Sequence, residues 1–184
     1  MLAARGSALA ASANDGPSSA ILHRAMDAFA NHRNSLVHRD RVGIVDFSRA
    51  SSLKRFFIID VETGASQSYL VAHGRGSDPA HTGWAQHFSN EPGSLASSTG
   101  AYVTGAEYTG KHGRSMRLTG LDSENCNAES RAIVVHAAWY VTPQIAAQTG
   151  KLGRSQGCFA VSDNSLGPVL DKLGAGRLIY ATKM

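Results

Sequence analysis

From Arg41 onward the chain consists of short apolar segments separated by turn residues, and this pattern most constrains its fold. The eight segments are residues 41–48, 55–63, 67–74, 101–109, 115–121, 131–141, 157–161 and 177–183. Short strands at fairly regular spacing with turn signals between them are typical of a β-sandwich or β-barrel. The 19 glycines fit a fold with many tight turns. The sequence therefore predicts a mainly β fold.

Two helices are expected beside the strands. The serines at 18 and 19 offer a hydroxyl N-cap, and apolar residues follow at helical spacing over 21–29. This spacing predicts an amphipathic N-terminal helix that ends near 31–34 and packs against the body of the domain. A second, short helix is expected over 166–173, after Cys158, where Gly174 is placed to stop it.

Length and composition indicate one domain. The chain has 184 residues, of which 42% are hydrophobic and 17% charged, which suits a single core. We expect residues 21–184 to form this domain. Residues 1–20 are rich in Ala and Ser, which fits either a flexible N-terminus or the remnant of a signal peptide.

The charge and hydropathy of the sequence indicate which classes of binding partner are compatible with it. The net charge of +4 comes from scattered basic residues, which is compatible with an anionic polymer such as a bacterial envelope and gives little support for nucleic acid. No apolar stretch approaches the roughly 20 residues of a membrane span. The long polar segment 75–100 contains Trp84 and Phe88 for local packing, so we expect an ordered loop near a functional site.

A histidine and a cysteine carry the strongest chemical signal. His136 ends the apolar run Ile133–Val135, and Cys158 ends the turn Ser155-Gln156-Gly157-Cys158. A free thiol with a pKa of ~8.5 is mostly protonated at neutral pH, so acyl transfer needs a base such as histidine. The pair is a candidate nucleophile and base. Gly157 would let a substrate approach the backbone N–H groups around Cys158 that hold an oxyanion.

Other interpretations stay open. Ser155 could hydrogen-bond within the turn or to substrate. A histidine that closes a strand is often a buried structural residue, and a Gly-Cys pair is often a small buried hydrophobe. Cys126 fits an incidental free thiol, although only geometry decides whether it pairs with Cys158. His73 and His112 each lie next to a glycine, so either could line the same pocket or only hydrogen-bond within a turn.

The eight histidines make a metal-dependent hydrolase an alternative. The sequence shows no His-Glu-x-x-His pattern or comparable ligand pair, and no Cys-x-x-Cys. We therefore predict no metal site.

Taken together, His136, the intervening residues 137–154 and the Ser-x-Gly-Cys turn resemble the signature of the YkuD-type L,D-transpeptidases. The segments VAHGRGSDP, FSNEPGSLASSTGAYVTG and GKHGRSMRLTGL resemble the compact branch often labelled murein L,D-transpeptidase catalytic domain. The resemblance covers roughly residues 41–184. It implies a β-rich fold and an exported protein of the periplasm or cell envelope.

The resemblance also implies a reaction. Cys158 would attack the bond between the third residue and D-alanine of a peptidoglycan stem tetrapeptide, and the resulting thioester would pass to the amine of a second stem as a 3→3 cross-link. The carbonyl of Ala137 would orient His136, carbapenem-type β-lactams would acylate the cysteine, and no cofactor is needed. With water as acceptor the site would be an L,D-carboxypeptidase, and with a protein lysine an anchoring enzyme.

Two positions depart from the family pattern. Gln156 stands where the family often has His or Arg, and Ala160 stands where it often has an arginine. If that arginine steadies a substrate carboxylate, either another cation must do so, with Arg75 and Arg154 as the candidates, or the substrate differs. The departures keep open a non-catalytic envelope-binding module with the same fold.

Overall fold

The computed structural model describes residues 16–184, so most of the predicted flexible or signal segment 1–20 lies outside the described residues. The expected N-terminal helix is confirmed as α1 (Ser19–Asn31). The Ser18 hydroxyl accepts a hydrogen bond from the N–H of Ile21 at 3.3 Å, which satisfies one free donor of the first turn. The apolar face of α1 is buried against the sheet, as the helical spacing predicted.

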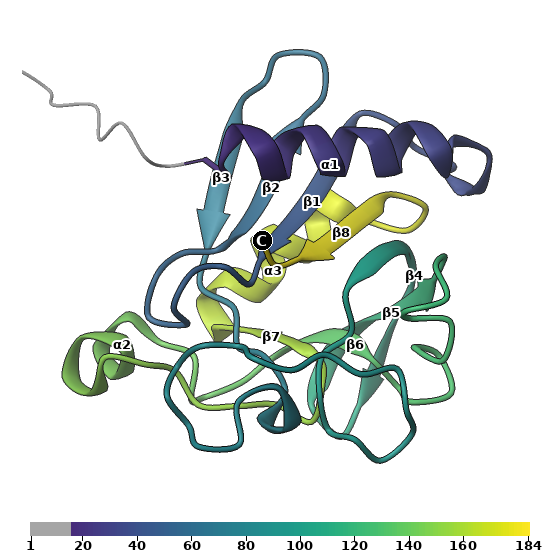
Figure 1. The fold of residues 1–184 in the computed structure, drawn as a ribbon. Coiled ribbons are helices and arrows are strands. Elements are labelled where there is room, and N and C mark those ends of the chain that lie inside the picture. The colour runs from purple at the N-terminus through teal and green to yellow at the C-terminus, as the bar shows by residue number, and fades with distance from the viewer. Residues whose placement is uncertain (1–15) are drawn as a thin grey trace, which may run out of the picture.

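The mainly β prediction is confirmed, and all eight strands belong to one mixed sheet (Figure 1). The strands are β1 (Arg41–Asp46), β2 (Phe56–Asp60), β3 (Ser66–Tyr69), β4 (Gly100–Gly110), β5 (Gly113–Gly120), β6 (Val134–Ala137), β7 (Phe159–Val161) and β8 (Leu178–Thr182). Their order in the sheet is β3-β2-β1-β8-β4-β5-β6-β7. The pairs β1–β8 and β6–β7 are parallel, and the other pairs are antiparallel.

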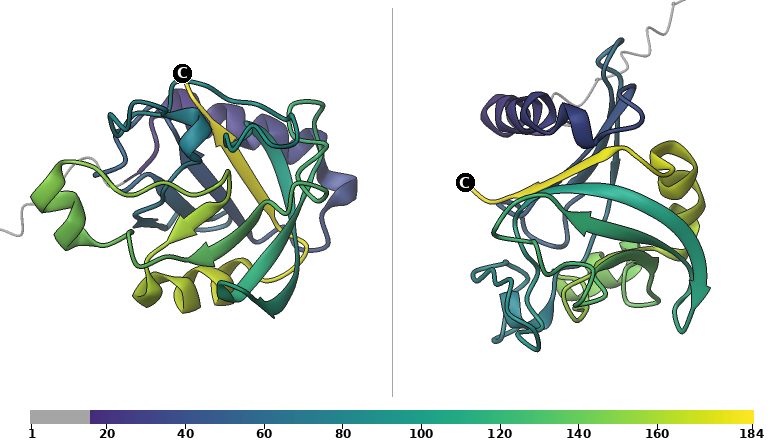
Figure 2. Two further views of the ribbon diagram at one scale, coloured as in Figure 1. Left: turned by 90° about the horizontal axis from the view of Figure 1, so that it is seen from below. Right: turned by 90° about the vertical axis from the view of Figure 1, so that its right-hand side faces the viewer.

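The sheet curves until its two edges meet, which gives it a barrel-like form. β4 and β5 bend strongly (Figure 2), and β4 carries a register shift between Thr104 and Glu107. Beyond the end of β3, Ala72 bridges to Ala160 of β7, and Gly74 bridges to Ser155. The chain after β3 therefore lies directly against the segment that holds Cys158.

Helices cover both faces of the central strands. α1 packs on one core, which contains Val42 and Ile44 of β1. The second expected helix is confirmed as α3 (Asp163–Leu173), whose buried side chains pack on the other core together with Val45. It begins three residues earlier than predicted because the hydroxyl of Ser162 caps it.

One helix was not predicted. α2 (Pro143–Thr149) begins after Thr142, whose side chain caps it, and ends at Gly150, which has a left-handed φ of 71°. The Thr-Pro start and Gly end are the signal that could have identified it. Two short 3-10 turns, η1 (Arg33–Ser35) and η2 (Arg75–Ser77), complete the elements. Within residues 16–184, no helix is both long and apolar enough to cross a membrane.

Candidate active site

Cys158 and His136 line the same cavity, which has a volume of about 450 Å³. Four parts of the chain build its walls: the loop 75–100, the end of β4 with the turn to β5, the segment 130–140 that contains β6, and the segment 154–158. The loop that was expected near a functional site contributes residues 92, 93 and 95 to the wall of this cavity. The sequence-predicted pair therefore faces one shared space.

Backbone hydrogen bonds hold the turn that carries Cys158 against the segment after β3. The N–H of Ser155 donates to the carbonyl of His73, and the N–H of Arg75 donates to the carbonyl of Ser155, both at 2.9 Å. The Ser155 hydroxyl donates to the carbonyl of Cys158 at 2.7 Å and accepts from the N–H of Gly157 at 3.1 Å. Ser155 thus makes its hydrogen bonds within the turn, one of the two possibilities the sequence left open.

A glycine is required at position 157, because both the backbone conformation and the nearby atoms exclude a side chain. Its φ is +116°, where side chains are strained, and a Cβ there would come within 2.8 Å of the carbonyl oxygen of Ala96. The hydroxyl of Ser97 donates to the Gly157 carbonyl at 3.1 Å and accepts from the N–H of Gly74 at 3.0 Å. Because the N–H of Gly157 already donates to Ser155, it is not free to bind an oxyanion in this conformation.

The thiol of Cys158 is held in its protonated form. Burial raises its pKa, and the backbone N–H groups of Val134 and Cys158 and the charges of Lys111 and Arg131 counter this only in part. The Sγ atom lies 3.5 Å from the carbonyl oxygen of Ala132, to which the thiol donates a hydrogen bond. Among the hydrogen bonds of the described residues, none joins Cys158 Sγ to His136.

His136 is a neutral imidazole with a fixed orientation. Its Nδ1 lies 2.7 Å from the carbonyl oxygen of Ala137, a contact that requires Nδ1–H and leaves Nε2 as an acceptor. Burial lowers the pKa of His136; the bond to Ala137 opposes this shift, and the neighbouring His112 and Lys111 add to it. A neutral imidazole with an unprotonated Nε2 can accept a proton at neutral pH.

His112 stacks on His136. The ring centroids are 4.3 Å apart and the ring planes differ by 20°. His112 also lines the cavity, from the turn that joins β4 to β5. Of the two histidines that could share the pocket, the structure brings this one to it.

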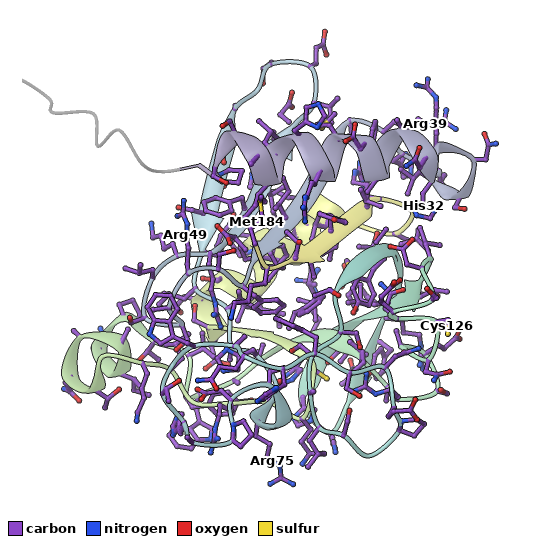
Figure 3. The ribbon with its side chains drawn as sticks, viewed as in Figure 1. His32, Arg39, Arg49, Arg75, Cys126 and Met184 are labelled. Atoms are coloured by element: carbon purple, nitrogen blue, oxygen red, sulfur yellow. The ribbon has the colours of Figure 1, made fainter. Side chains whose placement is uncertain are left out.

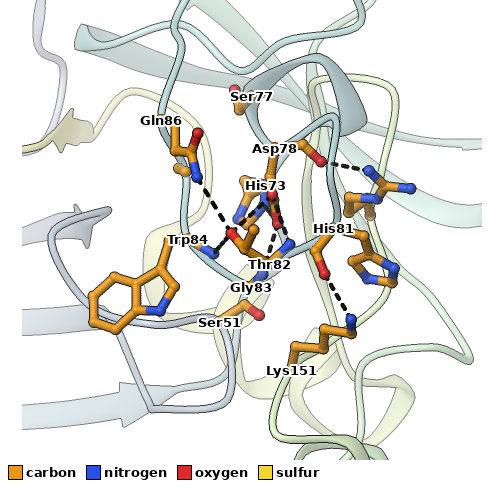
Figure 4. A network of polar contacts seen from close by, with 12 residues as sticks. Ser51, His73, Ser77, Asp78, His81, Thr82, Gly83, Trp84, Gln86 and Lys151 are labelled. Carbon is orange, nitrogen blue, oxygen red and sulfur yellow. Dashed lines mark hydrogen bonds and ion pairs between the residues drawn. The ribbon is translucent and has the colours of Figure 1, made fainter.

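His73 does not reach the cavity. It is 1% exposed, and its Nδ1 accepts a hydrogen bond from Arg55 at 2.7 Å. Its Nε2 makes no hydrogen bond and lies 3.4 Å from Oδ2 of Asp78; Figure 4 shows His73 beside Asp78. Burial, together with the charge of Arg55, lowers the pKa of His73 to about 3. We call Arg55, His73 and Asp78 the buried polar cluster. It lies behind the Cys158 turn, so the proposed substrate contact of His73 is replaced by a structural role.

The two arginines predicted to bind a carboxylate are placed differently. Arg75 is exposed and points away from the body of the protein (Figure 3), outside the cavity wall. Arg154 lines the cavity, but its Nη1 donates to the carbonyl oxygens of Asp78 and Pro79. Gln156 lines the cavity and is exposed, whereas Ala160 is fully buried in β7.

Sequence reasoning missed several residues of the cavity wall, among them Lys111, Arg131 and Tyr140. Burial raises the pKa of Tyr140 to about 12, so its phenol stays protonated. Lys111 precedes His112 in the turn and Arg131 precedes the His136 strand, so proximity to predicted residues was the available signal.

Neither cysteine forms a disulfide. Cys126 is exposed on a different part of the surface (Figure 3) and accepts a hydrogen bond from Asn90 at 3.1 Å. Across residues 16–184, no group of three or more His, Cys, Asp or Glu residues could hold a metal ion.

Comparisons with known proteins agree on a family. The family model described as "L,D-transpeptidase catalytic domain" matches residues 13–182. No curated protein matches the chain.

Several solved structures are similar to this chain at low sequence identity. An L,D-transpeptidase from Mycobacterium smegmatis is 13% identical over 78% of this chain, with a TM-score of 0.47. L,D-transpeptidase 3 from Mycobacterium tuberculosis, solved with a faropenem-derived adduct, is 13% identical over 78%, also with a TM-score of 0.47. An L,D-transpeptidase from Xylanimonas cellulosilytica is 15% identical over 91% of this chain and 70% of that one, with a TM-score of 0.45. The chain spans only 58% and 60% of the lengths of the two mycobacterial chains.

Proposed function

The chain belongs to the L,D-transpeptidase catalytic domain family, and on this premise we propose that it is a cysteine acyltransferase that acts on peptidoglycan stem tetrapeptides. Its product would be a 3→3 cross-link, and its place would be the periplasm or another part of the cell envelope. The observation that carries the proposal is that a neutral His136 with an acceptor Nε2 shares a cavity with a protonated Cys158 thiol.

The resting pair is neutral, so the proton must move during the reaction. The thiol leaves the carbonyl of Ala132 and turns to His136, which takes its proton as sulfur attacks the substrate carbonyl carbon. In structures without substrate, catalytic hydrogen bonds are often long or absent and form only in the complex. His136 then returns the proton to the departing D-alanine amine, and a thioester remains on Cys158.

In the second half of the reaction, the thioester on Cys158 is the group that is attacked. The side-chain amine of another stem attacks the thioester carbonyl, passes a proton to His136 and forms an amide, and the thiol regains its proton. The oxyanion of each tetrahedral intermediate needs donors that are already in place. Because Gly157 N–H is occupied by Ser155, we assign the N–H of Cys158 as the oxyanion donor on the turn.

Water as the acceptor would turn the same thioester into free tripeptide, which is the L,D-carboxypeptidase reaction. The cavity fits both outcomes, because the acceptor acts only after D-alanine has left. No cofactor enters either reaction.

One observation favours a second candidate, a non-catalytic envelope-binding module. Burial raises the pKa of Cys158, and its thiol is bonded to Ala132 rather than to His136. Such a module would bind cell-wall sacculi without turning them over.

Acylation by a carbapenem separates these candidates. We expect intact-mass analysis to show a stoichiometric adduct on the wild-type protein and none on Cys158→Ser, because a serine hydroxyl is far less ionised beside the same histidine. Cys126→Ser is the matched control, since Cys126 lies outside the cavity, and it should react like wild type. A folded wild-type protein that forms no adduct would favour the binding module.

A further inference from the structure

The cavity around Cys158 carries positive charge and no acid. Lys111, Arg131 and Arg154 line it together with two histidines, and none of its lining residues is Asp or Glu. A cleft lined by charges of one sign concentrates ligands of the opposite sign. The cavity therefore suits a ligand with a negative charge near the attacked bond.

Two of the three cations already have partners within the protein. Arg131 donates four hydrogen bonds to the loop 75–100, two to backbone carbonyls and two to serine hydroxyls. Arg154 uses Nη1 for two backbone carbonyls of the same loop. Both guanidinium groups hold the cavity wall in place, which reduces their capacity for a ligand.

Lys111 is different. It is exposed on the turn between β4 and β5, and within residues 16–184 no hydrogen bond or ion pair engages its ammonium group. Its charge nevertheless lowers the pKa of both Cys158 and His136. Lys111 also lines the same cavity as Cys158 and His136, so its ammonium group is free to bind a ligand beside both reacting groups.

We propose that Lys111 binds the terminal carboxylate of the acyl donor, an inference that rests on the proposed function. The residue that leaves carries a free α-carboxylate only a few bonds from the attacked carbonyl carbon. Ala160 is fully buried and has no group that could contact this carboxylate. Lys111 would make the enzyme select peptides that end at the leaving residue over peptides that continue beyond it.

Charged and neutral thiol reagents test the inference without any peptide. Iodoacetate is an anion and iodoacetamide is neutral, so the ratio of their alkylation rates at Cys158 reports anion attraction. Lys111→Met should lower this ratio about tenfold, the size expected for a lost charge-assisted contact. A change in thiol pKa would affect both reagents equally and cancel in the ratio.

The protein supplies its own controls. The same ratio at Cys126, followed by peptide mapping, should not change, because Cys126 lies outside the cavity. Lys54→Met removes an exposed lysine elsewhere and should leave the Cys158 ratio as in wild type. Lys111→Arg keeps the charge and should retain most of the ratio. A ratio that changes less than about twofold in a folded Lys111→Met protein would overturn the inference.

A pair of tetrapeptides then tests the substrate. One tetrapeptide has a free D-alanine carboxylate, and in the other this group is a carboxamide. We expect Lys111→Met to lower kcat/KM about tenfold for the carboxylate peptide and to leave kcat/KM for the carboxamide peptide nearly unchanged. If wild type turns over neither peptide while the alkylation ratio still depends on Lys111, the proposed function fails and the anion site stands. Equal losses on both peptides would contradict carboxylate recognition.

Discussion

His73 and His136 occupy two regions that differ in how their polar groups are satisfied. Both imidazoles are almost fully buried, at 1% and 3% exposure, and both have a lowered pKa. His73 is enclosed by Arg55 and Asp78, whereas one ring nitrogen of His136 faces the cavity. Burial alone therefore does not distinguish a reactive histidine from a structural one; the difference is whether a ring nitrogen remains available to a ligand.

The first prediction concerns the cavity side of this comparison. His136→Ala should lower kcat/KM for acylation by about 10²- to 10⁴-fold, because the base is lost. The protein should still fold, although the buried imidazole and its stacking on His112 are lost, so the thermal midpoint should fall without loss of the cooperative transition. Peptide kinetics and a melting curve on the same sample measure both effects. The control is His23→Ala on the exposed face of α1, and equal activity losses in the two variants would refute the base assignment.

The second prediction concerns the buried polar cluster. Burial tends to raise the pKa of Asp78, but hydrogen bonds from Thr82 and Gly83 outweigh it and the pKa is lowered, so the carboxylate is charged at neutral pH. Asp78→Asn would leave the buried charge of Arg55 with less compensation, and the free energy of unfolding should fall by about 3 kcal/mol.

Urea denaturation at neutral pH tests the size of this effect. Asp171→Asn is the matched control, because its ion pair with Arg114 is exposed and should contribute about 0–1 kcal/mol. Similar small losses in both variants would show that the Asp78 carboxylate does little to stabilise the buried charge of Arg55. Since a lowered carboxyl pKa stabilises only the ionised form, the difference between Asp78→Asn and wild type should shrink as pH falls below about 4.

The third and smallest prediction concerns the stacked pair. The charge of His112 helps keep the pKa of His136 low, so removing it should raise that pKa toward its ordinary value of about 6.5. The acid limb of the pH profile of kcat/KM should then move to higher pH, by less than about one unit. His112→Phe keeps a stacked ring without the charge and should show this shift with little loss at the optimum. No shift in His112→Phe would mean that the charge of His112 does not affect the base.

Much of the fold could be predicted because it depends on local patterns. The two-residue period marked the strands, and the cap residues marked α1 and α3. The segment 131–141 was expected as one long strand, but β6 keeps only Val134–Ala137 because the chain turns away to form α2. Ala72 and Ala160 join the two edges of the sheet. This contact is a long-range pairing, and no local pattern in the sequence reveals it.

The candidate site shows the same limit. The turn 155–158 and His136 could be identified because their residue types match a known chemistry. His73 and His112 gave similar local signals beside glycine, and only the positions of Arg55 and Asp78 decide that His73 is enclosed. Lys111 stands beside His112 in the sequence, but its role depends on which cations the folded loop 75–100 has already engaged, and no local pattern shows that.

The position of β8 in the sheet bears on how the protein is made. β8 follows every other strand in the chain, yet it lies in the middle of the sheet between β1 and β4. While the ribosome is still producing residues 178–182, β1 and β4 have no common partner and expose unpaired edges. The complete sheet, in which β8 joins β1 to β4, can therefore form only after this strand has been synthesised, and until then the unpaired edges are open to association with other chains.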